Sequence, residues 1–328
     1  SSVYQDFARP WHRIRHSWYW NRKGDQPCCS PQISKSNGRN PSKNIWRKQK
    51  LVNEHEPSSA KDLLPTLGKV IAKYQISAKK SLGQHFLLDK NLTDRIAIIA
   101  NVRELTVIEI GAGPGGLTRS LLQQGAKRVI AVEKDPSCLA ALQDLQRVYS
   151  NQLTLVEADA LDLNLSNLSS SPYTIVANLP YNISTALLIG WLQQIGPVSQ
   201  MTLMFQKEVA DRLVALPSTK NYGRLTIMTQ WLCEVKLKFN IHSKVFVPPP
   251  RVVSSVVTLV PRAVPLAPAN WINLEKVTSA AFNQRRKMLR SSLRGFHFNF
   301  LALEIDPTWR AENLTIEQFC RLARNIKD

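Results

Sequence analysis

An asparagine, a proline and a tyrosine directly follow an apolar run in VANLPYNIST, residues 176–185. A strand that reaches Pro180 cannot continue its ladder, because proline has no N–H to donate. The side-chain oxygen of Asn178 and a main-chain carbonyl, that of Leu179, could each accept one hydrogen of an exocyclic amino group and so localise its lone pair. Tyr181 could stack on the base. The motif predicts alkylation of an adenine amino nitrogen, although Asn-Leu-Pro is also common in ordinary turns.

Three other strand ends carry residues suited to a cofactor. Gly111 and Gly113 belong to a glycine-rich turn that follows a β-branched run, where the backbone can approach a ligand closely. Glu133 ends the next apolar run and could accept hydrogen bonds from both hydroxyls of a ribose. Asp159 ends a third run and could accept one from an adenine amino group. These residues predict a cofactor that contains adenosine, and both NAD and S-adenosylmethionine satisfy them.

Short β-branched runs alternate with helical patterns along the middle of the chain, and this alternation predicts βαβ units in a doubly wound, mostly parallel α/β sheet. The carboxyl ends of such strands share one edge, where these folds bind ligands. A Pro- and Ala-rich linker then precedes residues 270–295, which are predicted to form helices of a small second domain. The segments that hold the predicted strands are 106–125, 128–135, 153–161 and 173–181.

The chain is strongly basic, with a formal net charge of +19 over 328 residues. Such a balance is typical of proteins that bind nucleic acid or an anionic membrane. Its 44% hydrophobic content is ordinary for a globular protein and allows a sizeable core. The charge therefore favours a nucleic-acid partner.

The five cysteines are scattered and have no partners at metal-ligand spacing. We expect reduced thiols, no metal site and a cytoplasmic location. No apolar stretch approaches the roughly 18 residues that span a bilayer, so we expect no membrane association. We also expect a monomer.

Residues 1–60 differ in composition from the rest. They carry 11 Lys and Arg against 4 Asp and Glu, which is +7 and leaves +12 for the remainder, and they show no sustained helical or strand periodicity. One interpretation is a basic, aromatic arm that binds nucleic acid. The other, which we favour, is a disordered extension or one that results from a translation start placed too far upstream. We predict a catalytic domain over 61–262 and a helical domain over 263–328.

From about residue 66 to 325 the chain resembles the small-subunit (16S) rRNA adenine N6,N6-dimethyltransferases of the KsgA/RsmA type. The resemblance implies a Rossmann-like fold that uses S-adenosylmethionine, followed by a small C-terminal helical domain. The segments that carry it are KKSLGQHFLLD (79–89), IEIGAGPGGLT (108–118), VEKD (132–135), EADAL (157–161), ANLPYNIST (177–185), MFQKEVADRL (204–213), YGRLT (222–226) and VFVPPPRVVSSVV (245–257).

The resemblance also implies site residues. Phe205 would be a second aromatic that stacks on the base. His85 stands where many members of the family have asparagine, and because histidine can change charge near neutral pH, its contact with the cofactor could depend on pH. The cofactor contacts that it implies are His85, Leu87, Gly111, Glu133, Asp159 and Asn178, to which the glycine turn adds Gly113.

The family's reaction is two methyl transfers to each of two adjacent adenosines in a hairpin loop near the 3′ end of the small-subunit rRNA. Its partner would be 16S rRNA within the small ribosomal subunit, and its role would be in ribosome biogenesis. A basic run on a predicted helix would bind RNA phosphates. The run comprises Arg285, Arg286, Lys287, Arg290 and Arg294.

Three alternatives stay open. A large-subunit rRNA dimethyltransferase would share the catalytic residues, but the second domain and the segment VPPPRVVSSVV favour the small-subunit type. A non-catalytic RNA- or DNA-binding factor could use the same fold, although the presence of Asn178, Pro180 and Tyr181 with Glu133 argues against it. A nicotinamide dehydrogenase is disfavoured because nothing pairs with His85 as a hydride-site acid.

Overall fold

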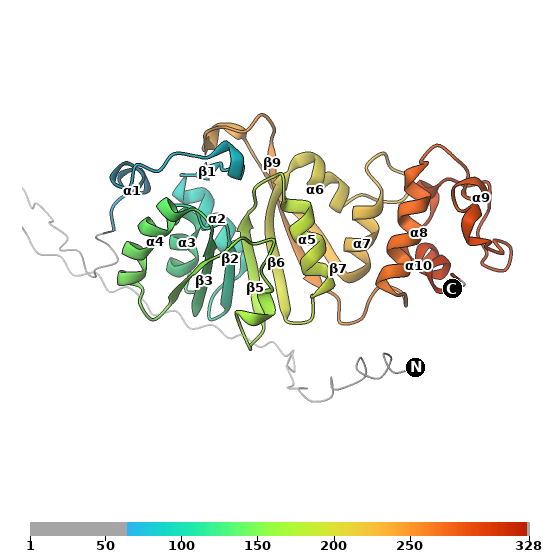
Figure 1. Cartoon of the computed structure of the whole chain (residues 1–328), viewed down its shortest axis with the longest axis horizontal. Coiled ribbons are helices and arrows are strands. Elements are labelled where there is room, and N and C mark those ends of the chain that lie inside the picture. Colours follow the sequence, from blue (N-terminus) through green and yellow to red (C-terminus); the bar gives the residue numbers. More distant parts are fainter. Residues whose placement is uncertain (1–63, 327–328) are drawn as a thin grey trace, which may run out of the picture. The chain divides into compact units, whose positions relative to one another are not determined.

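The computed structural model describes residues 64–326, so the predicted extension over 1–60 lies outside the described residues. In this part of the chain one sheet has the strand order β4-β3-β2-β5-β6-β9-β7 (Figure 1). β2 to β6 pair in parallel, whereas β9 pairs antiparallel with both β6 and β7. Its strands are β2 (Thr106–Ile110), β3 (Arg128–Glu133), β4 (Leu153–Glu157), β5 (Tyr173–Asn178), β6 (Val198–Gln206), β7 (Cys233–Ile241) and β9 (Ser254–Pro261).

The four strands predicted from β-branched runs are present as β2, β3, β4 and β5, which confirms the α/β fold. Successive side chains of β2 enter different cores: Val107 belongs to one buried cluster, and Ile108 to another on the opposite face. A strand buried on both faces reads as a continuous apolar run, because neither side can carry polar residues cheaply.

Helices cover both faces of this sheet. α2, α3 and α4 pack on the face that holds Val107, and α5 and α6 pack on the face that holds Ile108 (Figure 1). α4 begins where Asp135 accepts a hydrogen bond from the Ser137 amide and Pro136 occupies the first turn. The α-helices that precede β7 in the chain are α1 (Leu67–Lys73), α2 (Lys90–Ala100), α3 (Gly116–Gln123), α4 (Pro136–Val148), α5 (Ser184–Gln193), α6 (Lys207–Leu213) and α7 (Arg224–Leu232).

A separate two-stranded sheet lies outside the main one. β1 (Phe86–Leu87) pairs antiparallel with β8 (Phe246–Val247), with Leu87 opposite Phe246. Both phenylalanines are buried. This pairing ties the segment before α2 to the segment before β9, 160 residues later in the chain.

The C-terminal part consists of α8 (Trp271–Asn283), α9 (Leu289–Ser292) and α10 (Ile316–Arg324). Its core is shared with α7, since Ile227 and Met228 belong to the same buried cluster as Val277 and Phe319. The indole N–H of Trp231 also donates to the Ala267 carbonyl at 2.7 Å. The domain boundary at residue 262 stays a prediction. Among residues 64–326, no helix is both long and apolar enough to cross a membrane.

The expectation that one helix carries the whole basic run is wrong. α8 ends at Asn283, so Arg285, Arg286 and Lys287 lie in a turn, whereas Arg290 belongs to α9. Arg294 starts a short 3-10 helix, Arg294–Phe296. The helix breaks because the next segment turns away to pair with a distant one: Met288 forms a β-bridge with Arg310.

Candidate active site

A cavity of about 290 Å³ lies where the carboxyl ends of β2, β3, β4 and β5 meet. The strands are in register, with Ile110 opposite both Val132 and Ala177, so their last residues reach the same edge. The segment 81–87 closes another side of the cavity. The predicted site residues that line it are His85, Leu87, Gly111, Gly113, Glu133, Asp159, Asn178, Leu179, Pro180 and Tyr181.

The glycine turn folds back onto β3. Gly111 and Gly113 have φ values of 71° and 55°, a left-handed conformation that glycine adopts without strain. The Gly111 amide donates to the Val132 carbonyl at 2.9 Å. A side chain on Gly113 would also approach the Phe86 ring at 3.4 Å, the tight end of ordinary contact. The turn therefore needs glycine for its backbone conformation.

Glu133 closes this turn. One carboxylate oxygen accepts the Gly113 amide at 2.6 Å, and the other accepts the amides of Lys134 and Asp135 at 2.8 Å each. The residue is buried, and these three main-chain donors fix the orientation of its carboxylate. A carboxylate has about four acceptor positions, which leaves capacity for a ligand hydroxyl.

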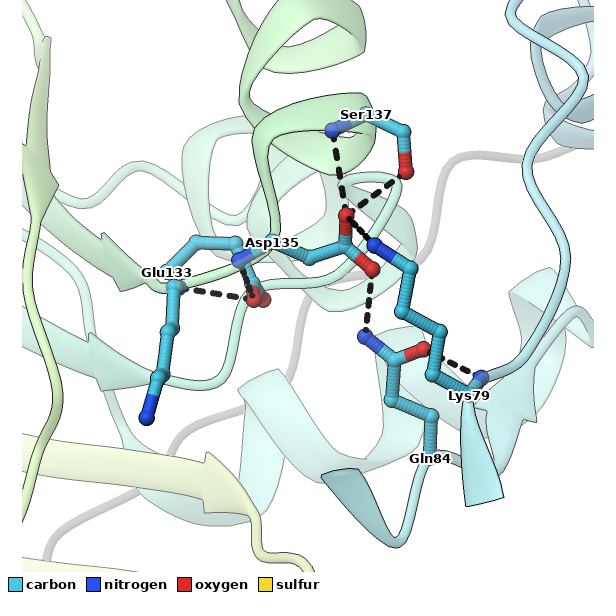
Figure 2. Close-up of polar contacts among 6 residues, drawn as sticks. Lys79, Gln84, Glu133, Asp135 and Ser137 are labelled. Atoms are coloured by element: carbon cyan, nitrogen blue, oxygen red, sulfur yellow. Dashed lines mark hydrogen bonds and ion pairs between the residues drawn. The ribbon is translucent and has the colours of Figure 1, made fainter. Parts of the chain in front are cut away.

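Figure 2 shows a polar network that sequence reasoning missed, built around Asp135. The Asp135 side chain is fully buried and accepts hydrogen bonds from Lys79 at 2.7 Å and from Gln84 at 3.1 Å. Burial alone would raise the pKa of Asp135, but these bonds and those from Ser137 outweigh it and lower the pKa to about 2. The network fastens the segment that carries His85 to the end of β3. Lys79 and Asp135 begin and end two of the quoted motifs, but nothing in the sequence pairs them.

The Asn178 side chain is oriented by the main chain of the segment 81–87. Its Nδ2 donates to the His85 carbonyl at 3.0 Å. Because that nitrogen is used, the oxygen is the end of the amide that is free to accept. This matches the acceptor role predicted for Asn178.

Tyr181 and His85 stack on one another, with ring centroids 5.6 Å apart and an interplanar angle of 29°. The Tyr181 hydroxyl lies 2.5 Å from the Ser254 hydroxyl, and burial raises the pKa of the phenol. His85 Nδ1 lies 2.7 Å from the Pro248 carbonyl, which can only accept, so Nδ1 must be the donor. Nε2 is then left for any further contact of this histidine.

Asp159 is held by an ion pair. Its carboxylate lies 2.6 Å from the Lys134 ammonium and also accepts the Leu161 amide at 3.0 Å. The hydrogen bond from Lys134 lowers the pKa of Asp159. The carboxylate is thus ionised and fixed at the end of β4, next to the cavity.

Glu109 is a second residue that the sequence reasoning missed. It lies in β2, is buried and lines the cavity, and among the described residues its Oε2 has no hydrogen-bond partner. The pKa of its carboxyl is raised to about 8, chiefly by burial and also by the charge of Glu133, against the opposing effect of Thr118. A buried acid without a full set of partners suits a ligand that brings positive charge. Its signal in the sequence is a lone acid inside the apolar run TVIEI.

Two groups of predicted residues do not line this cavity. Phe205 is fully buried in β6, opposite Ser255 of β9, and belongs to the core on one face of the sheet. The basic run lies in the C-terminal part. Arg285 there forms an ion pair with Glu312 at 3.0 Å, whereas Arg286 is exposed.

The model of the family described as ribosomal RNA adenine dimethylase matches residues 75–328. The chain belongs to this family. It is also 51% identical over 269 residues to a ribosomal RNA small subunit methyltransferase A of Rhodospirillum rubrum, a match that covers 81% of this chain and 93% of the relative. The chain is an enzyme that uses S-adenosylmethionine.

Solved structures agree with this assignment. A dimethyladenosine transferase from Plasmodium falciparum superposes with a TM-score of 0.61 at 27% identity, covering 73% of this chain and 96% of that chain. The 23S rRNA methyltransferase ErmE superposes with a TM-score of 0.56 at 27% identity, covering 74% of this chain and 99% of that chain. Both similarities span most of the chain.

The cavity fits the cofactor of the family. S-adenosylmethionine carries positive charge on its sulfonium and amino groups, and the cavity is lined by the carboxyl groups of Glu109, Glu133 and Asp159. The unpartnered oxygen of Glu109 is the observation that favours a cationic ligand most directly.

Proposed function

We propose that the chain dimethylates N6 of two adjacent adenosines in the 3′-terminal hairpin loop of 16S rRNA within the small ribosomal subunit. The observation that supports the proposal is the Asn178 amide, whose nitrogen donates to the His85 carbonyl and whose oxygen is left to accept from a substrate. The relative from Rhodospirillum rubrum is named for the small subunit, and the chain matches nearly its whole length. This supports the small-subunit substrate over the large-subunit one.

Asn178 and Leu179 act on the amino group of the target adenine. Asn178 Oδ1 and the Leu179 carbonyl each accept one amino hydrogen, which localises the nitrogen lone pair for attack. Pro180 holds the turn that places these two acceptors. When bound, S-adenosylmethionine supplies an electrophilic methyl group. Once the nitrogen has four substituents it is acidic and loses a proton to water, so these residues need to position the base rather than deprotonate it.

Tyr181 receives the face of the flipped base. Its hydroxyl is hydrogen-bonded to that of Ser254 and its ring stacks on His85, so the ring is held in place beside the cavity. A fixed aromatic face binds an extruded base at low entropic cost. Phe205 has no part in this stacking, because its side chain is in the core.

Glu133 and Asp159 bind the nucleoside part of the cofactor. Glu133 uses its remaining acceptor capacity for ribose hydroxyls, and Asp159 accepts from the adenine amino group. His85, Leu87, Gly111 and Gly113 shape the cavity around them.

RNA phosphates are bound by the basic body of the enzyme. Residues 61–328 carry +12 of the net charge, and Arg286, Lys287, Arg290 and Arg294 are exposed in the C-terminal part. Arg285 contributes charge and also forms an ion pair with Glu312, which stabilises this region. A ribosomal substrate also implies a cytoplasmic enzyme, and we propose that it acts as a monomer.

The test is incubation of the enzyme with labelled S-adenosylmethionine and undermethylated small subunits, followed by mapping of the modified bases. Dimethylation of two adjacent adenosines in the terminal hairpin loop is expected. A parallel incubation with large subunits is the comparison, and label in large-subunit rRNA alone would support the large-subunit alternative. Tight binding of small subunits without incorporation would support the non-catalytic alternative.

A further inference from the structure

One tryptophan of the C-terminal part is exposed in a way that packing does not explain. Trp309 retains 40% of its surface, whereas Trp191 and Trp231 retain 6% and 4%. Beside it on the paired segment, Met288 is also 40% exposed. Large apolar side chains that gather at the surface favour an interaction site over a structural role.

The backbone beneath Trp309 is fixed. Its carbonyl accepts the Leu289 amide at 2.7 Å, and the Pro307 carbonyl accepts the Arg290 amide at 3.0 Å. Leu289 is fully buried in the C-terminal core and anchors this pairing. The indole therefore projects from a rigid strip and not from a free loop.

Exposed cations flank Met288 and Trp309 along the two paired segments. Arg286, Lys287, Arg290 and Arg310 are exposed within two residues of Met288 or Trp309, and within residues 64–326 none of the four forms an ion pair. Two acids lie nearby: Asp306, whose carboxylate accepts hydrogen bonds from the amide and hydroxyl of Thr308 and interacts with the charge of Arg290, and Glu312, which is paired with Arg285. The Trp309 surface, comprising Arg286, Lys287, Met288, Arg290, Trp309 and Arg310, is thus strongly positive around an apolar centre.

We propose that the Trp309 surface binds an unpaired base of the substrate RNA, which stacks on the indole while Arg290 and its neighbours bind the adjoining phosphates. The inference rests on the proposed function, since it assumes that ribosomal RNA is the partner. Unpaired cations match a polyanion, and an indole face accepts any base by stacking. An apolar protein partner would leave these four cations desolvated or unpaired.

Two variants separate stacking from charge. Trp309→Leu keeps apolar volume but removes the aromatic face, and Arg290→Gln removes one charge. The measurement is the affinity of the full chain for undermethylated small subunits over a series of KCl concentrations. Trp309→Leu should weaken binding by roughly 5- to 150-fold without changing the salt slope, whereas Arg290→Gln should make the slope shallower by about 0.7 to 0.9.

Trp309→Phe and Leu301→Ala are the controls. Phenylalanine retains a face for stacking and should bind more tightly than Trp309→Leu. Leu301 is 89% exposed in the same part of the chain and should be replaceable without effect. Calorimetry with S-adenosylmethionine checks that each variant is folded.

The inference is overturned if Trp309→Leu binds like the unaltered protein, or if Phe and Leu at this position weaken binding equally. The inference is also overturned if Trp309→Leu weakens binding to a protein of the small subunit but leaves binding to protein-free rRNA intact. That result would identify a protein partner. Failure of the unaltered enzyme to bind or methylate small subunits would instead refute the proposed function.

Discussion

Replacing Asn178 by alanine removes two groups with separate effects. Nδ2, which donates to the His85 carbonyl at 3.0 Å, is lost from the fold, and a neutral hydrogen bond of this kind contributes about 1 kcal/mol to the free energy of unfolding. Oδ1 is lost from the reaction. Removal of one preorganised polar group raises an activation barrier by about 3 kcal/mol, which is roughly 150-fold in turnover.

The assay is single-turnover methylation of small subunits with labelled S-adenosylmethionine. Cofactor affinity and subunit affinity, measured separately, should stay close to those of the unaltered enzyme, because the proposed acceptor acts on the amino group of the base. Asn167→Ala is the matched control, since this asparagine is exposed and outside the cavity. It should leave turnover unchanged.

Asn178→Asp tests the orientation of the group. An aspartate keeps an acceptor but turns a carboxylate oxygen toward the His85 carbonyl, so it loses the tether and should be nearly as slow as the alanine variant. Turnover of Asn178→Ala within about 5-fold of the unaltered enzyme, roughly 1 kcal/mol, would refute the role of this amide.

Four further predictions follow from the cavity. Glu133→Ala should raise the cofactor dissociation constant about 10- to 100-fold by calorimetry, since charge-assisted bonds to hydroxyls contribute about 1.5–3 kcal/mol; unchanged affinity would contradict the assignment. Because the folded pKa of Asp135 is about 2, below its ordinary 3.8, its bonds stabilise the fold above pH 3.8, and this contribution is lost as the pH falls toward 2. Lys79→Met should therefore lower the free energy of unfolding at pH 7 by about 1 kcal/mol in urea titrations, and by less at pH 3. The value at pH 7 is small for an ion pair with a buried carboxylate because the half-exposed lysine is screened by solvent. The folded pKa of Glu109 is about 8, above its ordinary 4.5, so the stability of the cofactor-free protein should fall as pH rises between these values. A cationic cofactor favours the ionised form, so binding at pH 7 should release a proton, seen as buffer-dependent calorimetric heats, and Glu109→Gln should abolish the release. Finally, deletion of residues 1–57 should leave cofactor binding and methylation intact, because the family match begins at residue 75 and the cavity uses residues from 81 onward; a weaker, less salt-dependent interaction with RNA would show that the extension is a binding arm.

The strand ends were predictable because local pattern and topology agree there. Each predicted strand is a short β-branched run, and parallel strands in one sheet bring their last residues to one edge. Glu133, Asp159 and Asn178 therefore line one cavity, as their positions in the sequence predicted. A resemblance carried over residue by residue served less well for Phe205. Met201, Leu203 and Phe205 alternate on one face of β6, and all three are buried in the same core, a period of two that was readable in the sequence.

The C-terminal basic run shows the limit of local pattern. Helical propensity continues through residues 284–288, yet the chain leaves the helix because Met288 pairs with Arg310, and no local signal reports a partner 22 residues away. The same pairing places Trp309 beside Met288, so the proposed stacking surface was invisible before folding.

The sequence by itself determined the α/β architecture, the order of the glycine, acid and asparagine motifs along the chain, and the basic character that matches an RNA substrate. These depend on composition and on periodicities of a few residues. Only the tertiary structure decided which groups pair: Lys79 with Asp135, and the Asn178 amide with the His85 carbonyl. It also decided that one oxygen of Glu109 is buried without a hydrogen-bond partner among the described residues. The physical reason is that protonation state and side-chain orientation depend on burial and on neighbours distant in sequence, and both exist only once the chain has packed.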